Sequence, residues 1–362
     1  MSANETFRIA TLPGDGIGHE IIAACTEVLR VLEKRVGGFK LNYEFLEAGA
    51  DYYLKTGIDI TDEAFRKVGE ADAILLGAMG LPSVRYPDGT EISPHLNMRT
   101  AYGLYAGVRP VKAYPNVPGP LSDPRAANID MIVLRESTEG LFASRGVGKV
   151  TDDTEGTETL VITRDTCERL FDFAFRLARR RKEKGGKGRV TCVDKSNVFV
   201  AFAFFRKIFD ERAGNFPDIE TGYNYVDAMA LDMVRRPWDF DVLVAENMFA
   251  DILSDLGGGI IGGMGMASCA EIGDEHGLFQ PSHGSAPDIA GQDKANPSAT
   301  ILSAAMMLDW LGERAGCQGA MDAAQVLEDA IEKGFATQTL RPCEFGGPDG
   351  TKAYTKKLID LL

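Results

Sequence analysis

The chain has 362 residues, of which 44% are hydrophobic and 25% are charged, and its formal net charge is −14. This length and composition predict a globular protein with two domains or one large α/β unit. The negative charge argues against nucleic acid and anionic membranes as partners, although a locally basic site can still bind an anionic substrate.

The cysteines and the N-terminal residues indicate the cellular compartment of the protein. Six cysteines are scattered along the chain without a CxxC pair, which favours reduced thiols over a disulfide or zinc framework. The first residues are polar and lack the apolar segment of a signal peptide, and no run approaches the roughly 18 apolar residues that span a bilayer. We therefore expect a cytoplasmic protein that is not membrane-bound.

The first third of the chain alternates between strand and helix patterns. Strands are predicted over residues 7–12, 39–48 and 73–77. Helices are predicted over residues 20–34, 61–70 and 97–105. The glycine-rich turn at residues 13–18 has a spacing that differs from the dinucleotide-binding fingerprint, so alone it indicates little. The alternation predicts an α/β fold with a mostly parallel sheet and ligands at the carboxyl ends of its strands.

The middle of the chain continues this alternation, with one exception. Strands are predicted over residues 129–134, 188–193 and 241–245. Helices are predicted over residues 164–182, 198–212, 223–235 and 248–256. The exception is the polar segment 143–163, which ends in an alternating pattern at residues 157–162 and is too long for a plain loop. We expect it to be an arm that pairs with a second subunit.

Asp251 and Asp255 lie four residues apart on a predicted helix, so both carboxylates project from one face. Two like charges in this arrangement are unfavourable unless a cation bridges them, and oxygen ligands suit Mg²⁺ or Mn²⁺. A solvated acidic helix face is the alternative. The apolar neighbours Phe249 and Leu253 favour a partly buried helix, and so a metal site.

Four basic residues lie near predicted strand ends or short helices. Arginine binds carboxylates through two parallel hydrogen bonds, so Arg99, Arg109 and Arg135 could together clamp a di- or tricarboxylate. Lys195 follows a buried strand, where a lysine close to cations can lose its proton and act as a base. Surface ion pairs for the arginines and a solvated lysine are the alternatives.

The segment from His283 to Pro297 is rich in small residues and proline, so a flat ligand can approach its backbone closely. Asp288 in this segment could accept hydrogen bonds from two ribose hydroxyls, which would favour NAD and repel the 2′-phosphate of NADP. A helix predicted over residues 298–310 would direct its N-terminus at this segment. An ordinary surface turn is the alternative.

Several motifs occur together along the chain: Gly14-Asp15-Gly16-Ile17-Gly18, Arg99 and Arg109 at ten-residue spacing, Arg135-Glu136, Asp194-Lys195-Ser196-Asn197-Val198, Tyr225-Val226-Asp227-Ala228-Met229, Asp251-Ile252-Leu253-Ser254-Asp255, and the segment from His283 to Pro297. With them, nearly the whole chain resembles the β-decarboxylating dehydrogenases. This family comprises the 3-isopropylmalate, tartrate/D-malate, homoisocitrate and isocitrate dehydrogenases.

The resemblance implies a homodimer of two-domain subunits with an isopropylmalate dehydrogenase-like fold, a continuous, mixed and largely parallel sheet, and an active site in the interdomain cleft. We place a cofactor-binding domain at residues 1–104 and 262–362, and a domain for substrate, metal and dimerisation at residues 105–261. The resemblance also implies that Asp227 joins Asp251 and Asp255 at the metal across the dimer, and that Lys195 reaches into the neighbouring cleft.

In this family a loop like residues 284–296 binds the adenosine half of the cofactor, and aspartate at position 288 goes with NAD. The expected cofactor contacts are Ile17, His283, Gly284, Ser285, Ala286, Asp288, Ile289 and Asn296. The expected catalytic residues are Lys195 and Asp227. The expected substrate contacts are Arg99, Arg109, Arg135, His95 and Leu96.

The chain departs from the family pattern at two positions and is mixed at a third. Phe142 replaces the tyrosine that assists enol protonation, and Gln280 replaces a common glutamate. The specificity segment 92–96 is neither the leucine-lined surface of isopropylmalate enzymes nor the Ser and Asn pattern of isocitrate enzymes.

The residues and the resemblance together predict oxidative decarboxylation of a 2-hydroxy diacid with NAD and Mg²⁺ or Mn²⁺, nearest to the 3-isopropylmalate branch. A tartrate/D-malate-type enzyme is the alternative within the family. A non-catalytic regulatory subunit is the alternative from another class, motivated by Phe142 and Gln280. Retention of the lysine, the aspartates and the three arginines argues against it.

Overall fold

The computed structural model describes residues 5–362, and contacts within it divide the chain into two compact units. Unit 1 comprises the described residues up to Tyr102, together with Tyr114–Pro118 and Gly262–Leu362. Unit 2 comprises Gly103–Ala113 and Gly119–Ile261. The chain therefore passes from unit 1 into unit 2, returns briefly to unit 1 at Tyr114–Pro118, completes unit 2 and ends in unit 1. The roles assigned above to the two domains stay predictions.

Unit 1 contains five strands in the order β2 (Phe39–Phe45), β1 (Glu5–Gly14), β3 (Ala73–Ala78), β12 (Gly277–Pro281) and β11 (Ser268–Ile272). Every neighbouring pair is parallel except β11 and β12, which are antiparallel. Strand β3 is buried at all its positions, which explains its uninterrupted run of small and apolar residues.

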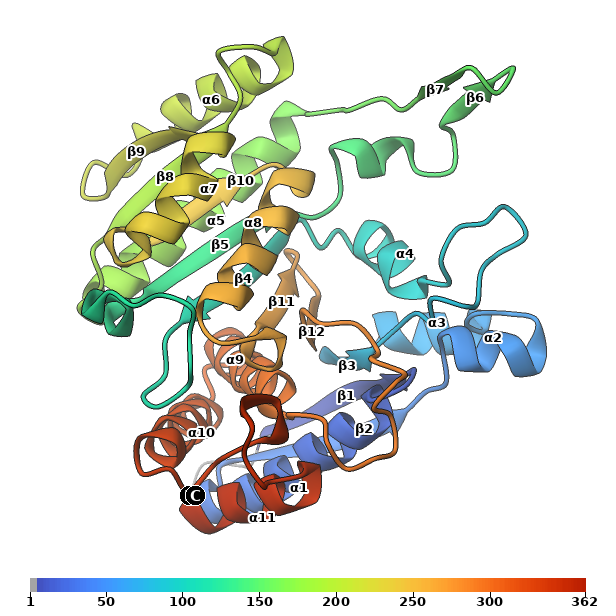
Figure 1. Cartoon of the computed structure of the whole chain (residues 1–362), viewed down its shortest axis with the longest axis vertical. Helices are drawn as coiled ribbons and strands as arrows, with labels where there is room; N and C mark the ends of the chain where they lie inside the picture. Colours follow the sequence, from blue (N-terminus) through green and yellow to red (C-terminus); the bar gives the residue numbers. More distant parts are fainter. Residues whose placement is uncertain (1–4) are drawn as a thin grey trace. The chain divides into compact units, whose positions relative to one another are not determined.

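Unit 1 also contains seven α-helices, which are labelled in Figure 1. They are α1 (Gly18–Val36), α2 (Ala50–Thr56), α3 (Asp62–Gly69), α4 (Pro94–Ala101), α9 (Ser298–Ala315), α10 (Gln318–Ala336) and α11 (Thr351–Leu361), with two short 3₁₀ helices, η4 (Met264–Met266) and η5 (Cys343–Phe345). Helix α9 packs against β11, β12 and α10, so it is buried over most of its length. At the start of α1, a Cβ on Gly18 would lie 2.1 Å from the Pro13 carbonyl oxygen, so this turn requires glycine.

The main sheet of unit 2 has five strands in the order β4 (Ala106–Lys112), β5 (Asp130–Glu136), β10 (Val242–Ala245), β8 (Arg189–Asp194) and β9 (Glu220–Tyr225). All neighbours are parallel except β4 and β5. The helices of unit 2 are α5 (Arg164–Glu183), α6 (Val200–Ala213), α7 (Val226–Arg235) and α8 (Asn247–Ile260), with 3₁₀ helices η1 (Pro124–Asn128), η2 (Leu141–Ser144) and η3 (Pro237–Asp239). The predicted α/β class with mixed, mostly parallel strands is confirmed.

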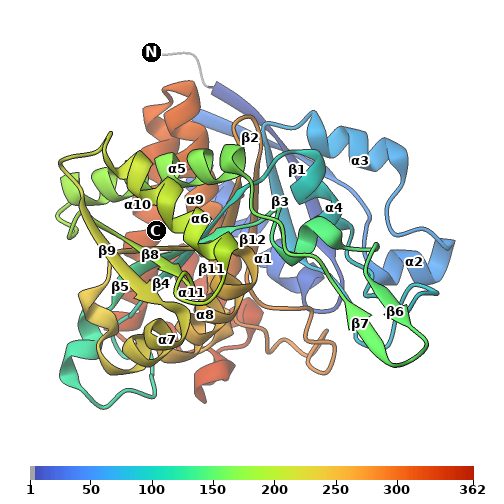
Figure 2. The same cartoon turned by 90° about the horizontal axis from the view of Figure 1, so that it is seen from above.

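The segment expected to be an arm forms a two-stranded antiparallel hairpin, β6 (Lys149–Thr151) and β7 (Glu155–Thr157). All residues of both strands are exposed, and Figure 2 shows the hairpin extending from the body of unit 2. The strand predicted at residues 157–162 is wrong in its bounds, because beyond Thr157 the segment makes only an isolated bridge between Gly140 and Val161.

The helix predicted over residues 223–235 is wrong at its start, because Tyr223 and Tyr225 belong to the edge strand β9. This strand is short and only Gly222 in it is buried, so its sequence lacks the apolar pattern of the inner strands. Within residues 5–362, no helix is long and apolar enough to cross a membrane.

Candidate active site

The parallel strands of unit 2 bring the predicted site residues to one edge. Arg135 is the penultimate residue of β5 and is paired in register with Ala245 at the end of β10. Lys195 follows the last residue of β8, and Asp227 follows β9 in the first turn of α7. Because carboxyl ends of parallel strands share an edge, these side chains come from one side of the sheet.

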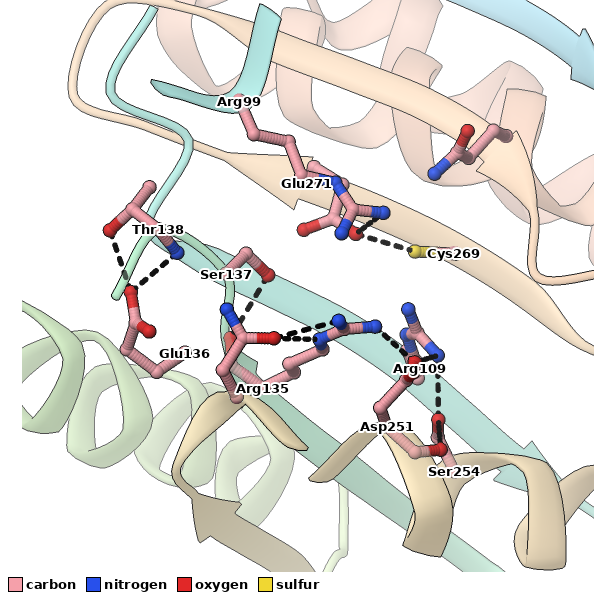
Figure 3. A network of polar contacts seen from close by, with 12 residues as sticks. Arg99, Arg109, Arg135, Glu136, Ser137, Thr138, Asp251, Ser254, Cys269 and Glu271 are labelled. Atoms are coloured by element: carbon pink, nitrogen blue, oxygen red, sulfur yellow. Dashed lines mark hydrogen bonds and ion pairs between the residues drawn. The ribbon is translucent and has the colours of Figure 1, made fainter. Parts of the chain in front are cut away.

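Two buried arginines from β4 and β5 converge on one carboxylate of α8 (Figure 3). Nη1 of Arg109 donates to Asp251 Oδ1 at 3.1 Å and to Ser254 Oγ at 2.7 Å. Nη1 of Arg135 donates to the same Asp251 oxygen, while its Nε and Nη2 donate to Asn247 Oδ1 at 2.9 and 2.7 Å. Both guanidinium groups are therefore held in fixed orientations.

Helix α8 presents the two predicted metal ligands on its open face. The side chains of Asp251 and Asp255 are 48% and 61% exposed, whereas Leu253 and Gly257 face the sheet. A Cβ on Gly257 would lie 2.5 Å from Val111 Cγ2, so glycine allows α8 to approach β4 closely. Partial burial raises the pKa of Asp255, an effect that Arg109 opposes and Asp251 reinforces.

The donor set on α8 suits a hard divalent cation. Asp251 and Asp255 supply carboxylate oxygens one helical turn apart, with Arg109 as their neighbouring cation. Among residues 5–362, no three His, Cys, Asp or Glu side chains are grouped so as to hold a metal ion. The two carboxylates fit Mg²⁺ or Mn²⁺ with positions left for further oxygen ligands.

Lys195 and Asp227 form a second charged pair at the same edge. Lys195 Nζ lies 2.5 Å from Asp227 Oδ1, and this hydrogen bond lowers the pKa of Asp227. We expected cations near Lys195, but the neighbour that the structure gives it is this carboxylate. The preceding residue, Asp194, is fully buried and paired with Arg206 at 2.6 Å, which fixes the backbone that carries Lys195.

Arg99, in the last turn of α4, lies in unit 1 and contacts a residue that the sequence did not single out. Its Nη2 lies 2.9 Å from Oε1 of Glu271 on β11, and the side chains are 6% and 0% exposed. His95 and Leu96 lie one turn earlier on α4 and are half-buried. Glu271 was missed because it lies in a short strand without a motif.

The loop after β12 is fixed to the glycine turn that precedes α1. The amide of Ile17 donates to the Ser285 carbonyl at 2.8 Å, and Ser285 Oγ donates to the Gly80 carbonyl. Ala286 has φ of +38°, and together with Ile289 it packs against the buried cluster of Ile17, Ile21 and Ala295. The backbone of this loop is therefore fixed by contacts with the rest of unit 1, unlike that of a plain surface turn.

The polar residues of this loop differ in what they can offer a ligand. Asp288 and Gly284 are exposed. His283 Nδ1 lies 2.9 Å from the Gly284 carbonyl, and burial lowers the pKa of His283. Asn296 is buried, with Oδ1 accepting from Ser298 at the start of α9 and Nδ2 donating to Glu344 at 2.8 Å. The polar atoms of the Asn296 side chain are therefore used in hydrogen bonds with other residues of the protein.

Phe142 and Glu136 lie where the chain turns from β5 into the hairpin segment. The Arg135 guanidinium carbon lies 5.6 Å from the Phe142 ring centroid. Glu136 is buried and accepts hydrogen bonds from Thr138 and from the Glu139 amide. Burial raises the pKa of Glu136 to about 7, although these hydrogen bonds oppose the shift.

Residues 8–362 match the family model described as isocitrate/isopropylmalate dehydrogenase. The chain belongs to this family. It is 41% identical to a 3-isopropylmalate/3-methylmalate dehydrogenase of Methanocaldococcus jannaschii, over 94% of each chain. It is 37% identical to a probable tartrate dehydrogenase/decarboxylase of Agrobacterium vitis, over 98% of this chain and 96% of that one.

Solved structures of this family have the same fold. An isocitrate dehydrogenase from Methylococcus capsulatus matches with a TM-score of 0.86 and 32% identity, over 98% of this chain and 99% of that one. An apo β-decarboxylating dehydrogenase from Thermococcus kodakarensis matches with a TM-score of 0.79 and 33% identity, over 98% and 96%. The chain is therefore a decarboxylating dehydrogenase of the isopropylmalate/isocitrate type, as its motifs predicted.

Proposed function

We propose that the chain oxidises and decarboxylates a 2-hydroxy diacid with NAD and Mg²⁺ or Mn²⁺, and that 3-isopropylmalate or a close 3-substituted malate is its substrate. The observation that carries this proposal is the convergence of Arg109 and Arg135 on Asp251 beside the open face of α8. Two oriented arginines can bind the carboxylates of a substrate. The two aspartates beside them can hold a divalent ion, which in turn binds substrate oxygens such as a hydroxyl.

Binding follows from the donors that these residues hold. Arg109 and Arg135 would bind substrate carboxylates, because each guanidinium group is already oriented by Ser254 or Asn247. Asp251 and Asp255 would hold the divalent ion, which supplies Lewis-acid stabilisation of the substrate oxygens when bound. Asp288 would accept hydrogen bonds from the ribose of NAD, and bound NAD accepts the hydride.

Lys195 is the base of the proposed reaction. Its Nζ would accept the proton of the α-hydroxyl as the C–H hydride leaves, which yields a 3-carboxy-2-keto acid. Breaking the adjacent C–C bond releases CO₂ and leaves the electron pair in an enolate, which one proton added at carbon converts into the 2-keto product. Asp227 holds Lys195 Nζ at 2.5 Å and so positions the base.

We further propose that the working form is a homodimer in which Lys195 and Asp227 act with Asp251 and Asp255 of the neighbouring chain. The exposed hairpin β6–β7 supports this proposal, because an isolated two-stranded hairpin is only marginally stable in water and gains from a partner. A cytoplasmic location also stays a prediction, supported by six free thiols.

The test is a panel of five acids: 3-isopropylmalate, D-malate, tartrate, isocitrate and homoisocitrate, each with NAD⁺ and Mn²⁺. We expect the purified chain to reduce NAD⁺ with the highest kcat/KM for 3-isopropylmalate. A preference for tartrate or D-malate would instead support the alternative that the Agrobacterium relative suggests. Failure to reduce NAD⁺ with any of the five would support the regulatory alternative and overturn the proposal.

A further inference from the structure

We propose that Arg206 is a positioning residue for the base of the proposed reaction: it joins the ends of β8 and β9, so that Lys195 and Asp227 meet in one fixed arrangement. This inference rests on the proposed function, because it takes Lys195 as the base. It goes beyond that function in assigning the geometry of the pair to a residue outside every motif that the sequence displays. All the residues involved belong to unit 2.

The backbone that carries Lys195 is held by the side chain of the residue before it. Oδ1 of Asp194 accepts a hydrogen bond from the Ser196 amide at 2.8 Å, which closes a tight turn around Lys195. On the other side, the amides of Val198 and Phe199 donate to the Lys195 carbonyl at 3.1 and 3.2 Å. The orientation of the Asp194 carboxylate therefore sets the course of the backbone at Lys195.

Arg206, on α6, fixes that carboxylate through two hydrogen bonds. Its Nε donates to Asp194 Oδ2 at 2.6 Å, and its Nη2 donates to Oδ1 at 3.1 Å. The Asp194 side chain is fully buried, and that of Arg206 is 25% exposed. A planar guanidinium group bonded in this way orients the carboxylate as well as neutralising its charge. A lysine ammonium would supply the charge without the planar, two-pronged geometry.

The same guanidinium group contacts β9. Its carbon lies 5.2 Å from the ring centroid of Tyr223 and 5.3 Å from that of Tyr225, within the range of cation–π interactions. The two tyrosines are two residues apart in the strand, so their side chains share one face of it. Tyr223 is also bonded to α6, because its hydroxyl donates to Asp210 Oδ1 at 2.7 Å. Arg206 therefore contacts β8 and β9 at once.

The register of these strands shows what this contact does for the charged pair. The parallel ladder of β8 and β9 ends at Asp194 and Tyr225, which are its last paired residues. Beyond this point the chain leaves the sheet on both sides, yet Lys195 Nζ lies 2.5 Å from Asp227 Oδ1. Arg206 contacts both residues of the last pair, so it fixes the separation of the two segments. A misplacement of about 1 Å near reacting groups can lower a rate about a hundredfold.

The decisive variant is Arg206→Lys, which keeps a positive charge beside Asp194, so the buried carboxylate is not left uncompensated. It loses the two parallel hydrogen bonds and the flat group between the tyrosine rings. With NAD⁺, Mn²⁺ and the preferred acid of the five, we expect kcat to fall about tenfold or more. Substrate KM should change little, because Arg109 and Arg135 are unaltered. A wild-type kcat would show that only the charge of Arg206 matters and would overturn the inference.

Arg212→Lys is the matched control for loss of stability. Arg212 lies six residues further along α6 and binds Asp172 in the same two-pronged way, through Nε at 2.8 Å and Nη2 at 2.5 Å. Its side chain is 28% exposed, close to the value for Arg206. Arg212→Lys should lower thermal stability and leave kcat unchanged. An equal fall of kcat in both variants would show a general effect of α6 and would overturn the inference.

Tyr225→Leu tests the same contact from β9 and leaves the ion pair of Arg206 and Asp194 intact, so it serves if Arg206→Lys does not fold. The change removes one of the rings that hold the guanidinium group in place. We expect kcat to fall about threefold or more, in line with the loss of one cation–π contact. Tyr225→Phe keeps the ring and should retain the wild-type kcat. A wild-type kcat in Tyr225→Leu would overturn the joining of β8 and β9 by Arg206.

Hydrogen exchange tests the link without turnover and so separates this inference from the proposed function. In Arg206→Lys the Ser196 amide should exchange about tenfold faster or more than in the wild-type chain, because its acceptor on Asp194 is less firmly held. Arg212→Lys should leave this amide unchanged. A wild-type exchange rate in Arg206→Lys would overturn the inference even if the chain reduces NAD⁺. A wild-type chain inactive on all five acids would overturn the proposed function, whereas faster exchange would still support the positioning of the Lys195 backbone by Arg206.

Discussion

Asp288 is the residue on which cofactor choice depends in the proposed reaction. Its side chain is exposed in the loop after β12, and the backbone of this loop is held by Ile17 and Ser285. A carboxylate there would face the 2′-phosphate of NADP⁺ and lose the ribose hydrogen bonds. We expect kcat/KM to favour NAD⁺ over NADP⁺ by about a hundredfold or more. Equal use of both cofactors by the wild-type chain would contradict this prediction.

Phe142 stands where the resemblance to the family predicts a tyrosine. A phenyl ring cannot donate a proton, and general acid assistance is typically worth about 10²–10⁴-fold in the step it serves. We expect Phe142→Tyr to raise kcat with little change in substrate KM, because the change adds only one hydroxyl to a ring whose centroid lies 5.6 Å from the Arg135 guanidinium carbon. Steady-state kinetics with solvent isotope effects on both forms measure this.

The competing possibility for Phe142 is that another group already protonates the enol and that the ring shapes the pocket. In that case Phe142→Tyr would lose activity or change substrate preference. An unchanged kcat in Phe142→Tyr, together with no solvent isotope effect in the wild-type chain, would contradict the hypothesis that protonation limits turnover.

The sequence predicted charged residues of the site better than it predicted their supports. Arg109, Arg135 and Asp251 were chosen by residue type and by position near strand ends, and the structure brings these three together. Asn247, which orients Arg135, lies four residues before Asp251, so helical spacing could have identified it. Glu271 could not be found in this way, because its contact with Arg99 spans 172 positions of the chain and depends on tertiary packing.

Helix α8 is the element on which the metal prediction depends. Its exposed face carries Asp251 and Asp255, and its buried face is fixed against β4 by Gly257. We expect Asp251→Asn to raise the half-saturating Mn²⁺ concentration about tenfold or more, because one anionic ligand becomes neutral. Mn²⁺ binding followed by electron paramagnetic resonance measures this without turnover.

The control for α8 is Asp360→Asn, which neutralises an exposed aspartate on α11 and should leave Mn²⁺ binding unchanged. Should Asp251→Asn bind Mn²⁺ as the wild-type chain does, or should EDTA leave activity intact, the assignment of the metal to α8 would fail.

The sequence predicted inner elements well and edge elements poorly. Strands such as β3 and β10 are buried at every residue, so their apolar runs identify them directly. The edge strand β9 has one buried residue, and its pattern merges with that of α7, so the predicted helix 223–235 includes the last three residues of β9. The bounds of β7 were missed because an exposed hairpin has no buried face to impose a periodic pattern.

At the scale of the whole molecule, the proposal requires two chains for each active site. Lys195 and Asp227 pair with each other at 2.5 Å, while Asp251 pairs with Arg109 and Arg135. If the first pair serves the neighbouring chain, a Lys195→Ala chain and an Asp251→Asn chain should complement each other. In a mixed dimer one site carries both defects and the other carries neither.

We therefore expect equal amounts of these two inactive variants, unfolded and refolded together, to recover about a quarter of wild-type activity, because half of randomly formed dimers are mixed and each has one intact site. Each variant refolded alone is the control and should stay inactive. A mixture of Lys195→Ala with Asp227→Asn should not recover activity. Lys195 and Asp227 of one chain serve the same active site, so each site of this mixed dimer carries one defect. Mixed dimers, isolated by two affinity tags, that show no activity above the controls would show that all four residues act within one chain.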